Sequence, residues 1–451
     1  MADPVRIVTR AVVYPMVAAL IASCSAANVG TATSRAEPIR AVETAPTFPR
    51  TAAYYLDQDE LPSIDELARY DVVVIDNEWA HRMPRSFFDE LHARSPRLKL
   101  LAYVNVVDSV HEIGSYEYWR NAYAMWQITK DDKAFRFPDQ WLAKTASGTP
   151  VHEWEDRVMA NLTDRAPRVD GRLFVEYAAD WIVDTVWTAG IWDGVFLDVW
   201  GDRIWTADAD RWDVDRDGVD ETDAEIYAPG GPWDRGLTIG ERRLRSALPT
   251  AILVANGNRT LRDGLLNGRV FESFADPAVR PDPIDDVYSY VDTASSGGQR
   301  QPSVSINVNT DREPPGSGAA LRKARFRFVA TLLQDGYWAP MGKDYGVLEY
   351  YDEMDGAGRG AGYLGRPLQP DPTVDALTRP REAGTGSPLG GVLRRDFENG
   401  IVLLNTTPGP VSIELERPYA RLRGTQDPVT NDGARASSVT IDGHDGIVLV
   451  R

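Results

Sequence analysis

The chain has 451 residues, 43% of them hydrophobic and 26% charged, and its 49 basic against 67 acidic residues give a net charge of -18. This length exceeds that of an average domain, roughly 100–200 residues, and predicts more than one domain with a sizeable core. The composition excludes a wholly disordered chain and a polytopic membrane protein. The negative charge argues against nucleic acid as a partner, because such a surface repels phosphate groups.

The N-terminal segment is typical of a bacterial lipoprotein signal peptide. Two arginines precede an apolar run over residues 11–22 that is too short to cross a membrane as a helix. The order Ile-Ala-Ser before Cys24, the only cysteine, resembles a lipobox. We expect a signal peptide over residues 1–23, lipidation of Cys24, and a flexible spacer over residues 24–50 that tethers an extracellular protein to the outer face of the cell membrane. The alternative is a cleaved signal with an incidental cysteine.

Residues 51–354 predict a (β/α)8 TIM barrel, because short apolar segments alternate with segments of helical periodicity. Several of the strands are apolar on both faces, as buried parallel strands are. The strands are predicted at 52–57, 71–76, 98–106, 193–198, 251–258, 269–274, 302–309 and 335–340, and the helices at 62–69, 84–94, 172–189, 236–248, 259–266 and 317–334. An open doubly wound sheet is the alternative, but no GxGxxG motif follows the first strand.

The pattern changes in the last quarter of the chain. Residues 355–388 are rich in glycine and proline and predict a linker or surface loop. Residues 389–451 contain short alternating segments separated by Asn-Gly and Asp-Gly turns. We therefore expect a small antiparallel β domain at the C-terminus.

Candidate catalytic residues are those that end the barrel strands, because barrel enzymes carry their chemistry at that face. Acids and amides dominate these positions, and no HExxH or GxSxG motif occurs, which disfavours zinc and serine hydrolases. A ring of carboxylates, amides and aromatic rings suits glycosidic bond cleavage, which needs one acid and one carboxylate on either side of the bond. We expect Asp198, which ends an apolar run, and Glu272, which has phenylalanines on both sides, to form this pair.

Other polar and aromatic residues beside the strand ends are expected to bind substrate. They are Asp57, Asp76, Glu78, Trp79, Asn105, Trp200, Asn258, Asn307, Trp338 and Glu353.

The segments DVVVIDNEW, LKLLAYVNV, GIWDGVFLDVWGD, FESF and DGYWAP, followed by Tyr351-Asp352-Glu353 and GYLG, resemble TIM-barrel glycoside-hydrolase-like families. These families are similar in layout to endo-α-1,4-polygalactosaminidases and, more distantly, to the α-galactosidase clan. The resemblance covers most of residues 51–451 and implies a glycoside hydrolase with Asp198 as nucleophile and Glu272 as proton donor. From the residues, Asp198 could act as nucleophile or as base, and we expect the substrate to be an extracellular or envelope polysaccharide with α-linked sugars. Glu78 and Glu353 are alternative proton donors. A carbohydrate-binding lipoprotein without catalysis is the competing interpretation.

An acidic loop follows the fourth predicted strand. Asp213, Asp215 and Asp217 alternate before Gly218, as at the opening of a calcium-binding loop. Position twelve of such a loop is Ala224, so Glu221, Asp223 or a residue elsewhere in the chain would complete the ligand set. We expect a structural Ca²⁺ and no cofactor for catalysis; the alternative is a solvated acidic loop.

Overall fold

The computed structural model describes residues 47–451 apart from 111–117, 130–135, 277–282, 296, 311–312, 314–315, 343, 371 and 379–390. The described residues belong to one compact unit, Ala45–Arg451. The predicted signal peptide, Cys24 and nearly all of the predicted spacer lie outside them. Within the described ranges, no helix is long and apolar enough to cross a membrane.

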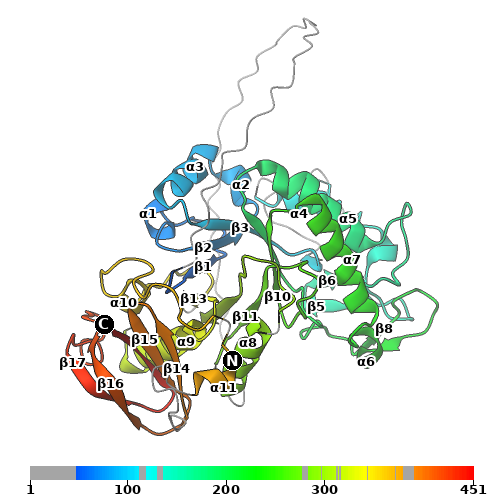
Figure 1. The fold of residues 1–451 in the computed structure, drawn as a ribbon. Helices are drawn as coiled ribbons and strands as arrows, with labels where there is room; N and C mark the ends of the chain where they lie inside the picture. The colour runs from blue at the N-terminus through cyan, green and yellow to red at the C-terminus, as the bar shows by residue number, and fades with distance from the viewer. Residues whose placement is uncertain are drawn as a thin grey trace, which may run out of the picture. The chain divides into compact units, whose positions relative to one another are not determined.

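Eight parallel strands form the central sheet, as the sequence predicts (Figure 1). In order around the sheet they are β1 (Ala52–Tyr55), β2 (Val72–Asp76), β3 (Lys99–Val104), β7 (Gly194–Leu197), β10 (Ile252–Asn256), β11 (Gly268–Glu272), β12 (Ile306–Thr310) and β13 (Tyr337–Met341). The last strand returns to the first through a parallel bridge between Thr51 and Trp338. The (β/α)8 barrel is therefore confirmed.

Helices surround these strands (Figure 1). The predicted helices appear as α1 (Ile64–Leu67), α3 (Arg85–Arg94), α5 (Phe174–Trp181), α7 (Pro232–Ala247) and α9 (Gly318–Leu332). Beyond α5 the helix widens over Ile182–Val186 and tightens over Trp187–Ala189. Local sequence explains the starts of two of them: Pro232 begins α7, and the Ser317 hydroxyl accepts from Ala320 N at the start of α9.

One predicted helix is wrong. Residues 259–266 form part of a loop between β10 and β11, in which Asp263 and Gly264 adopt left-handed backbone angles that a helix does not allow. Helix α8 (Pro283–Ser295) was not predicted and supplies the next crossover. Short helices also occur: α2 (Trp79–Arg82), α4 (Arg120–Met125), a 3-10 turn at Asp139–Trp141, α6 (Asp223–Ile226), α10 (Asp352–Asp355) and α11 (Val374–Leu377).

Two strand-to-helix connections carry small sheets of their own. The connection after β3 contains β4 (Asp108–Val110), β5 (His152–Trp154) and β6 (Arg157–Met159), which pair in the order β4-β6-β5. The connection after β7 contains β8 (Arg211–Trp212) paired with β9 (Glu221–Thr222). These connections extend the barrel at the C-terminal ends of its strands.

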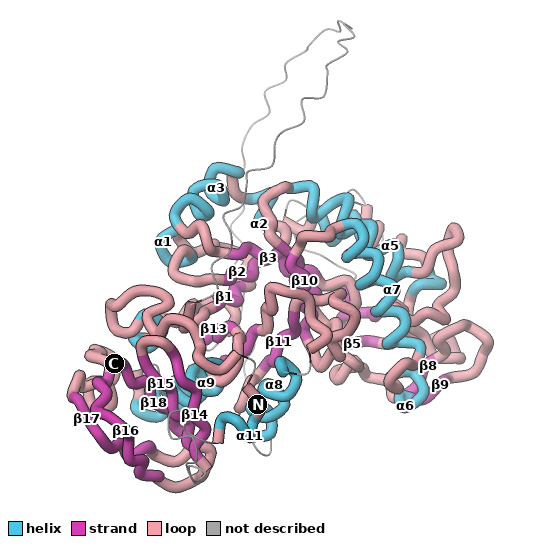
Figure 2. Tube along the Cα trace, in the orientation of Figure 1, coloured by secondary structure: helices cyan, strands magenta, loops and turns pink. Residues whose placement is uncertain are grey.

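The C-terminal β domain is also confirmed (Figure 2). Its strands are β14 (Val392–Phe397), β15 (Gly400–Asn405), β16 (Val411–Arg421), β17 (Arg435–Ile441) and β18 (Asp445–Val450), in the antiparallel order β14-β15-β18-β16-β17. The expected Asn-Gly turn joins β14 to β15, where Phe397 pairs with Gly400. The sheet rests on α9: the Arg325 guanidinium binds the Asp445 carboxylate at 2.8 Å, and a side chain at Gly446 would collide with Val329.

Candidate active site

Polar side chains at the ends of five strands face the inside of the barrel. Successive side chains of a strand point to opposite faces, so a residue two positions beyond an interior core residue points the same way. The interior core includes Val74, Leu101, Phe196, Val254 and Val270, and the residues two positions further on are Asp76, Tyr103, Asp198, Asn256 and Glu272. The pleat therefore gathers three acids, an amide and a phenol at the mouth of the barrel.

Asn256 joins the two expected catalytic acids. Its strand, β10, lies between β7 and β11, and its Nδ2 donates to Asp198 Oδ1 at 2.8 Å and to Glu272 Oε2 at 3.1 Å. The structure thus brings Asp198 and Glu272 to one amide group. Asn256 was not among the expected substrate-binding residues, although its alternation with Val254 was readable in the sequence.

Two tyrosines donate to the remaining oxygens of this pair. Tyr103 Oη donates to Asp198 Oδ2, and Tyr345 Oη donates to Glu272 Oε1 at 2.7 Å. Burial, together with the nearby carboxylates, raises the pKa of both phenols above the usual range, so both stay protonated donors. Tyr345 comes from the loop after β13, where Leu56 N donates to its carbonyl oxygen, and no sequence pattern pointed to it.

Two opposing effects act on the pKa of the Asp198 carboxyl. Burial raises its pKa to about 6 and the nearby Glu272 carboxylate acts in the same direction, whereas the hydrogen bonds from Tyr103 and Asn256 lower it. At neutral pH Asp198 is therefore mostly ionised and poorly hydrated, which suits a nucleophile.

The backbone turns sharply directly after each acid. Val199 has φ 54° and Ser273 has φ 53°, in the left-handed region that few residues other than glycine adopt. A β-branched residue such as Val199 is strained there, and such strain persists only where the surroundings hold it. The residues that follow Val199 provide this restraint.

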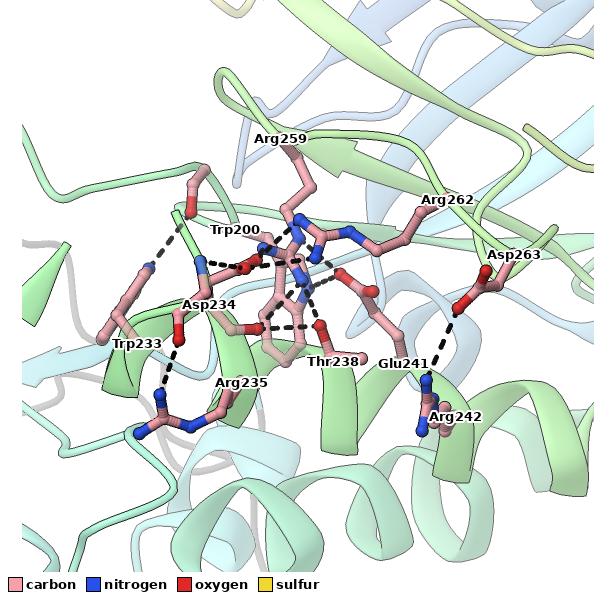
Figure 3. Close-up of polar contacts among 12 residues, drawn as sticks. Trp200, Trp233, Asp234, Arg235, Thr238, Glu241, Arg242, Arg259, Arg262 and Asp263 are labelled. Atoms are coloured by element: carbon pink, nitrogen blue, oxygen red, sulfur yellow. Dashed lines mark hydrogen bonds and ion pairs between the residues drawn. The ribbon is translucent and has the colours of Figure 1, made fainter. Parts of the chain in front are cut away.

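A buried polar network fixes the loop after β7 (Figure 3). Trp200 Nε1 donates to Glu241 Oε1 at 3.0 Å, and Arg259 Nε donates to the same oxygen at 2.7 Å. Arg259 also pairs with Asp234, so one guanidinium from the loop after β10 joins two acids of α7. All the charged groups of the network have partners, and the network holds Trp200, two residues beyond Asp198.

The same network explains why no helix forms over residues 259–266. The Arg259 side chain is 1% exposed, since it points into α7 instead of lying on a helix surface. Gly201 and Gly257 are in close contact nearby: a Cβ on Gly257 would lie 2.6 Å from the Gly201 Cα. The close packing of the loops after β7 and β10 therefore requires glycine at position 257, where φ is also 114°, and leaves little room for a side chain at position 201.

A second acidic pair beside the mouth was missed. Glu153 of β5 accepts from Thr206 Oγ1 at 3.1 Å, and Asp108 of β4 accepts from Arg157 Nη1 at 2.6 Å. Burial, and next the adjacent Asp108, raise the pKa of Glu153 above its usual range, and the charge of Asp198 contributes as well. Glu153 therefore holds a proton more readily than an exposed glutamate does. It lies in an insertion whose sequence gives no strand-end signal.

Four expected substrate-binding residues lie at or near the mouth. Asp76 faces inward as described, and Asn105 Nδ2 donates to Asp108 at 3.2 Å. Asp57 accepts from Asp59 N in the loop after β1, beside the loop that carries Tyr345. Asn258 is exposed and donates to Asp202 at 3.2 Å.

Three others point out of the barrel, and we no longer expect them to bind substrate. Asn307, Trp338 and Trp200 are at most 1% exposed. Asn307 donates to Thr331 Oγ1 of α9, and the Trp338 ring packs on Phe328 of the same helix. The pleat decides this outcome for the two strand residues, because each is one position out of phase with the interior core.

Glu78, Trp79 and Glu353 are buried in other surroundings. Glu78 accepts from Asn121 N at 2.7 Å and so caps the start of α4, while burial raises its pKa to about 8. Trp79 is 3% exposed. Glu353 accepts from Asn431 Nδ2 of the C-terminal domain at 2.7 Å. These contacts are structural, and they argue against Glu78 and Glu353 as alternative proton donors.

The acidic loop brings three of its five expected calcium ligands together. Carboxylate oxygens of Asp213, Asp215 and Asp217 lie within 4.8 Å of one another. Arg165 pairs with Asp215 and, at 2.7 Å, with Glu221. Asp223 pairs with Arg203 instead of joining the three aspartates. The three aspartates therefore fit a hard cation, Glu221 could join them only by leaving Arg165, and Asp223 does not belong to the cluster.

Comparison with known proteins supplies the context for this geometry. A model described as hypothetical glycosyl hydrolase family 15 matches residues 92–401. The glycoside hydrolase domain of PelA from Pseudomonas aeruginosa is similar in structure, with 17% identity over 65% of this chain and 94% of that one and a TM-score of 0.37. Eubacterium rectale Amy13B has 11% identity over 90% of this chain and 97% of that one, with a TM-score of 0.46. No curated protein matches the sequence.

The buried network offers a test of how firmly the loop after β7 is held. Arg259→Met should lower the free energy of unfolding by about 3–5 kcal/mol, because it leaves Glu241 and part of Asp234 buried without a counter-charge. The matched control is Arg242→Met, whose guanidinium is 64% exposed and pairs with Asp263 at 3.4 Å. It should cost about 1 kcal/mol or less in the same urea titration. Equal losses in the two variants would contradict the assigned role of the network.

Proposed function

The chain belongs to hypothetical glycosyl hydrolase family 15, and from this premise we propose that it cleaves α-linked glycosidic bonds of an extracellular or envelope polysaccharide, with Asp198 and Glu272 as the catalytic pair. That it is a glycosidase follows from the family. The linkage, the substrate and the residues are the proposal.

One observation carries the assignment of the pair. Asp198 and Glu272 share the Asn256 amide, so their facing oxygens are separated by no more than the sum of the two hydrogen-bond lengths, about 6 Å. Carboxyl groups of retaining glycosidases lie about 5–5.5 Å apart, whereas those of inverting enzymes are separated by roughly 6.5–9.5 Å to admit a water. The limit applies to the two facing oxygens, and it brings both acids within reach of one glycosidic bond. Retention is part of the proposal.

The proposed mechanism has two displacements. In the first, Asp198 attacks the anomeric carbon as Glu272 gives its proton to the glycosidic oxygen, so that the leaving sugar departs as an alcohol and a glycosyl ester remains on Asp198. In the second, Glu272 takes a proton from water, and the resulting hydroxide breaks the ester at the anomeric carbon. Both acids are thereby restored, and the configuration at the anomeric carbon is retained.

The hydrogen-bond partners suit this division of roles. Tyr103 and Asn256 both donate to Asp198, which stabilises the ionised nucleophile and fixes its orientation. Tyr345 donates to Glu272 from an exposed loop, so this contact can yield to substrate more easily than one made from a strand.

The competing interpretation, a carbohydrate-binding protein without catalysis, explains these features less well. Binding alone does not require two acids within reach of one amide, nor a backbone strained directly after each of them. Their assembly is costly because a poorly hydrated site disfavours the ionised form of an acid. A catalytic role explains why the protein keeps this unfavourable arrangement.

We further propose that the enzyme acts at the outer face of the bacterial cell membrane, held there by a lipid on Cys24. The support is the sequence pattern of residues 1–24, in which the only cysteine follows a short apolar segment. The membrane would then be its one partner besides the polysaccharide.

A structural calcium ion is the last part of the proposal. Asp213, Asp215 and Asp217 would hold it through carboxylate oxygens, and Gly218, with φ 89°, permits the turn. Its charge would offset the repulsion among the three aspartates and order the loop between β8 and β9. Catalysis does not depend on it.

The catalytic pair is tested by replacing each acid with its amide, which preserves volume and removes the ionisable group. Asp198→Asn should lower kcat about a thousandfold or more on every substrate, with little change in Tm. Glu272→Gln should keep most of its activity on aryl glycosides with activated leaving groups, because these leaving groups need little protonation. Asp263→Asn, an exposed acid of the loop after β10, is the control. Full activity of Asp198→Asn would overturn the assignment.

The lipid anchor is tested by fractionating cells that express the full chain. Cys24→Ser should move the protein from the membrane to the soluble fraction, because a serine accepts no thioether-linked lipid. Persistence of this variant in the membrane fraction would show that Cys24 is not the anchor.

The calcium site is tested by thermal unfolding in excess chelator and in millimolar calcium. Calcium should raise Tm, since a ligand at 100 times its Kd stabilises the native state by about 2.7 kcal/mol. Asp217→Ala, which removes the ligand oxygens, should abolish the response, whereas Asp210→Ala, at an exposed position just before β8, should keep it. An identical Tm of the unmodified protein in both buffers would count against the site.

A further inference from the structure

Two exposed tryptophans distinguish one side of the barrel mouth. All thirteen tryptophans are among the described residues, and eleven of them are buried or half-buried. Trp154 and Trp205 are 55% and 72% exposed. Large indole rings left in water next to a candidate active site indicate a surface that binds something with an apolar face.

The backbone contacts around these residues place them beside each other. Trp154 ends β5, and Trp205 lies in the loop after β7. Asp208 N donates to His152 O at 2.9 Å, and His152 N donates to Asp208 Oδ1 at 2.9 Å, so the chain around residues 206–208 runs along β5. The Thr206 hydroxyl, next to Trp205, donates to Glu153, next to Trp154.

The barrel topology places the two tryptophans on the side of the mouth where Asp198 lies. β4, which is linked to β5 through β6, begins four positions after the end of β3, and β3 lies beside β7 in the central sheet. Trp205 is seven positions beyond Asp198 on the loop that Asp198 begins. A polymer with one sugar at Asp198 would continue past these rings if it followed this side of the mouth.

Neither tryptophan is on a free chain end. The Arg203 guanidinium lies 4.5 Å from the centre of the Trp205 ring and is itself held by Asp223. The pairing of β5 with β6 holds the backbone of Trp154. Because both tryptophans lie on restrained segments, a ligand that stacks on them loses less conformational entropy than one that binds a free chain end.

We propose that Trp154 and Trp205 form an aromatic platform that stacks on sugar rings of a polysaccharide at subsites beyond the two sugars next to the scissile bond. A pyranose presents an apolar face of C–H groups, and an indole ring offers a flat apolar surface of similar size. This inference rests on the proposed function and adds to it that the substrate is a chain long enough to reach the platform. It also replaces the expectation, drawn from the sequence, that Trp200 and Trp338 fill this role.

Binding is measured apart from catalysis by electrophoresis of Asp198→Asn protein through native gels cast with amylopectin, galactomannan or α-1,4-linked galactosaminan. We expect at least one polymer to retard it. Adding Trp154→Ala or Trp205→Ala should weaken that retardation about fivefold or more, as measured by the polymer concentration needed. Trp205→Tyr, which keeps an aromatic face, should restore most of it. Val429→Ala, at an 83% exposed position of the C-terminal domain, is the control and should change nothing.

Hydrolysis of a 4-nitrophenyl glycoside panel by the otherwise unmodified chain separates this inference from the proposed function. The platform variants should keep their activity on these short substrates, because an aryl glycoside does not reach the platform, while Asp198→Asn loses it. Equal retardation of all variants, or no retardation by any of the three polymers, would overturn the platform. Aryl glycoside activity that survives Asp198→Asn would overturn the catalytic assignment and leave the platform standing.

Discussion

The alternation of side chains along parallel strands is the constraint on which the site depends. In a closed barrel, every second residue of each strand faces the interior, and the strands end together at one rim. Asp198, Asn256 and Glu272 occupy in-phase positions on three neighbouring strands, so an amide falls between two acids without help from any loop. A shift of one position on any of these strands would turn its functional group toward the helices. Asn307 shows this outcome, because it is one position out of phase with the interior core and contacts α9.

Gathering acids in a poorly hydrated mouth is unfavourable, and the structure offsets this in three ways. Neutral donors, Asn256 and the tyrosines, bind the oxygens of the two acids without adding charge to the site. Burial and the adjacent Asp108 raise the pKa of Glu153, which favours its uncharged form. Arg259 pairs with the acids of α7, and this network holds the loop after β7 in place. The restraint allows the strained backbone at Val199 to persist. Neutral hydrogen-bond donors thus surround the proposed catalytic acids, whereas a cationic side chain pairs with the acids of α7.

Loops inserted after the barrel strands bring further polar and aromatic side chains to the mouth. The small sheets after β3 and β7 bring Glu153, Trp154 and Trp205 to the edge of the mouth, and the loop after β13 brings Tyr345. Loops of this kind carry specificity in barrel enzymes, because they vary without disturbing the strands. The division matches the proposed roles: bond cleavage on the strand ends, and recognition of a longer sugar chain on the loops.

The sequence by itself determined the eight barrel strands, most of the helices and the C-terminal sheet, because apolar runs and their periodicity follow directly from burial. It also singled out Asp198 and Glu272 as acids at strand ends, and the structure brings these two to one amide group. Only the tertiary structure decided which other residues face the mouth. Trp200, Trp338 and Glu353 are buried against partners distant in the chain, and Tyr345, Glu153 and Trp205 reach the rim through loop contacts. Such contacts join segments far apart in sequence, and no local pattern encodes them.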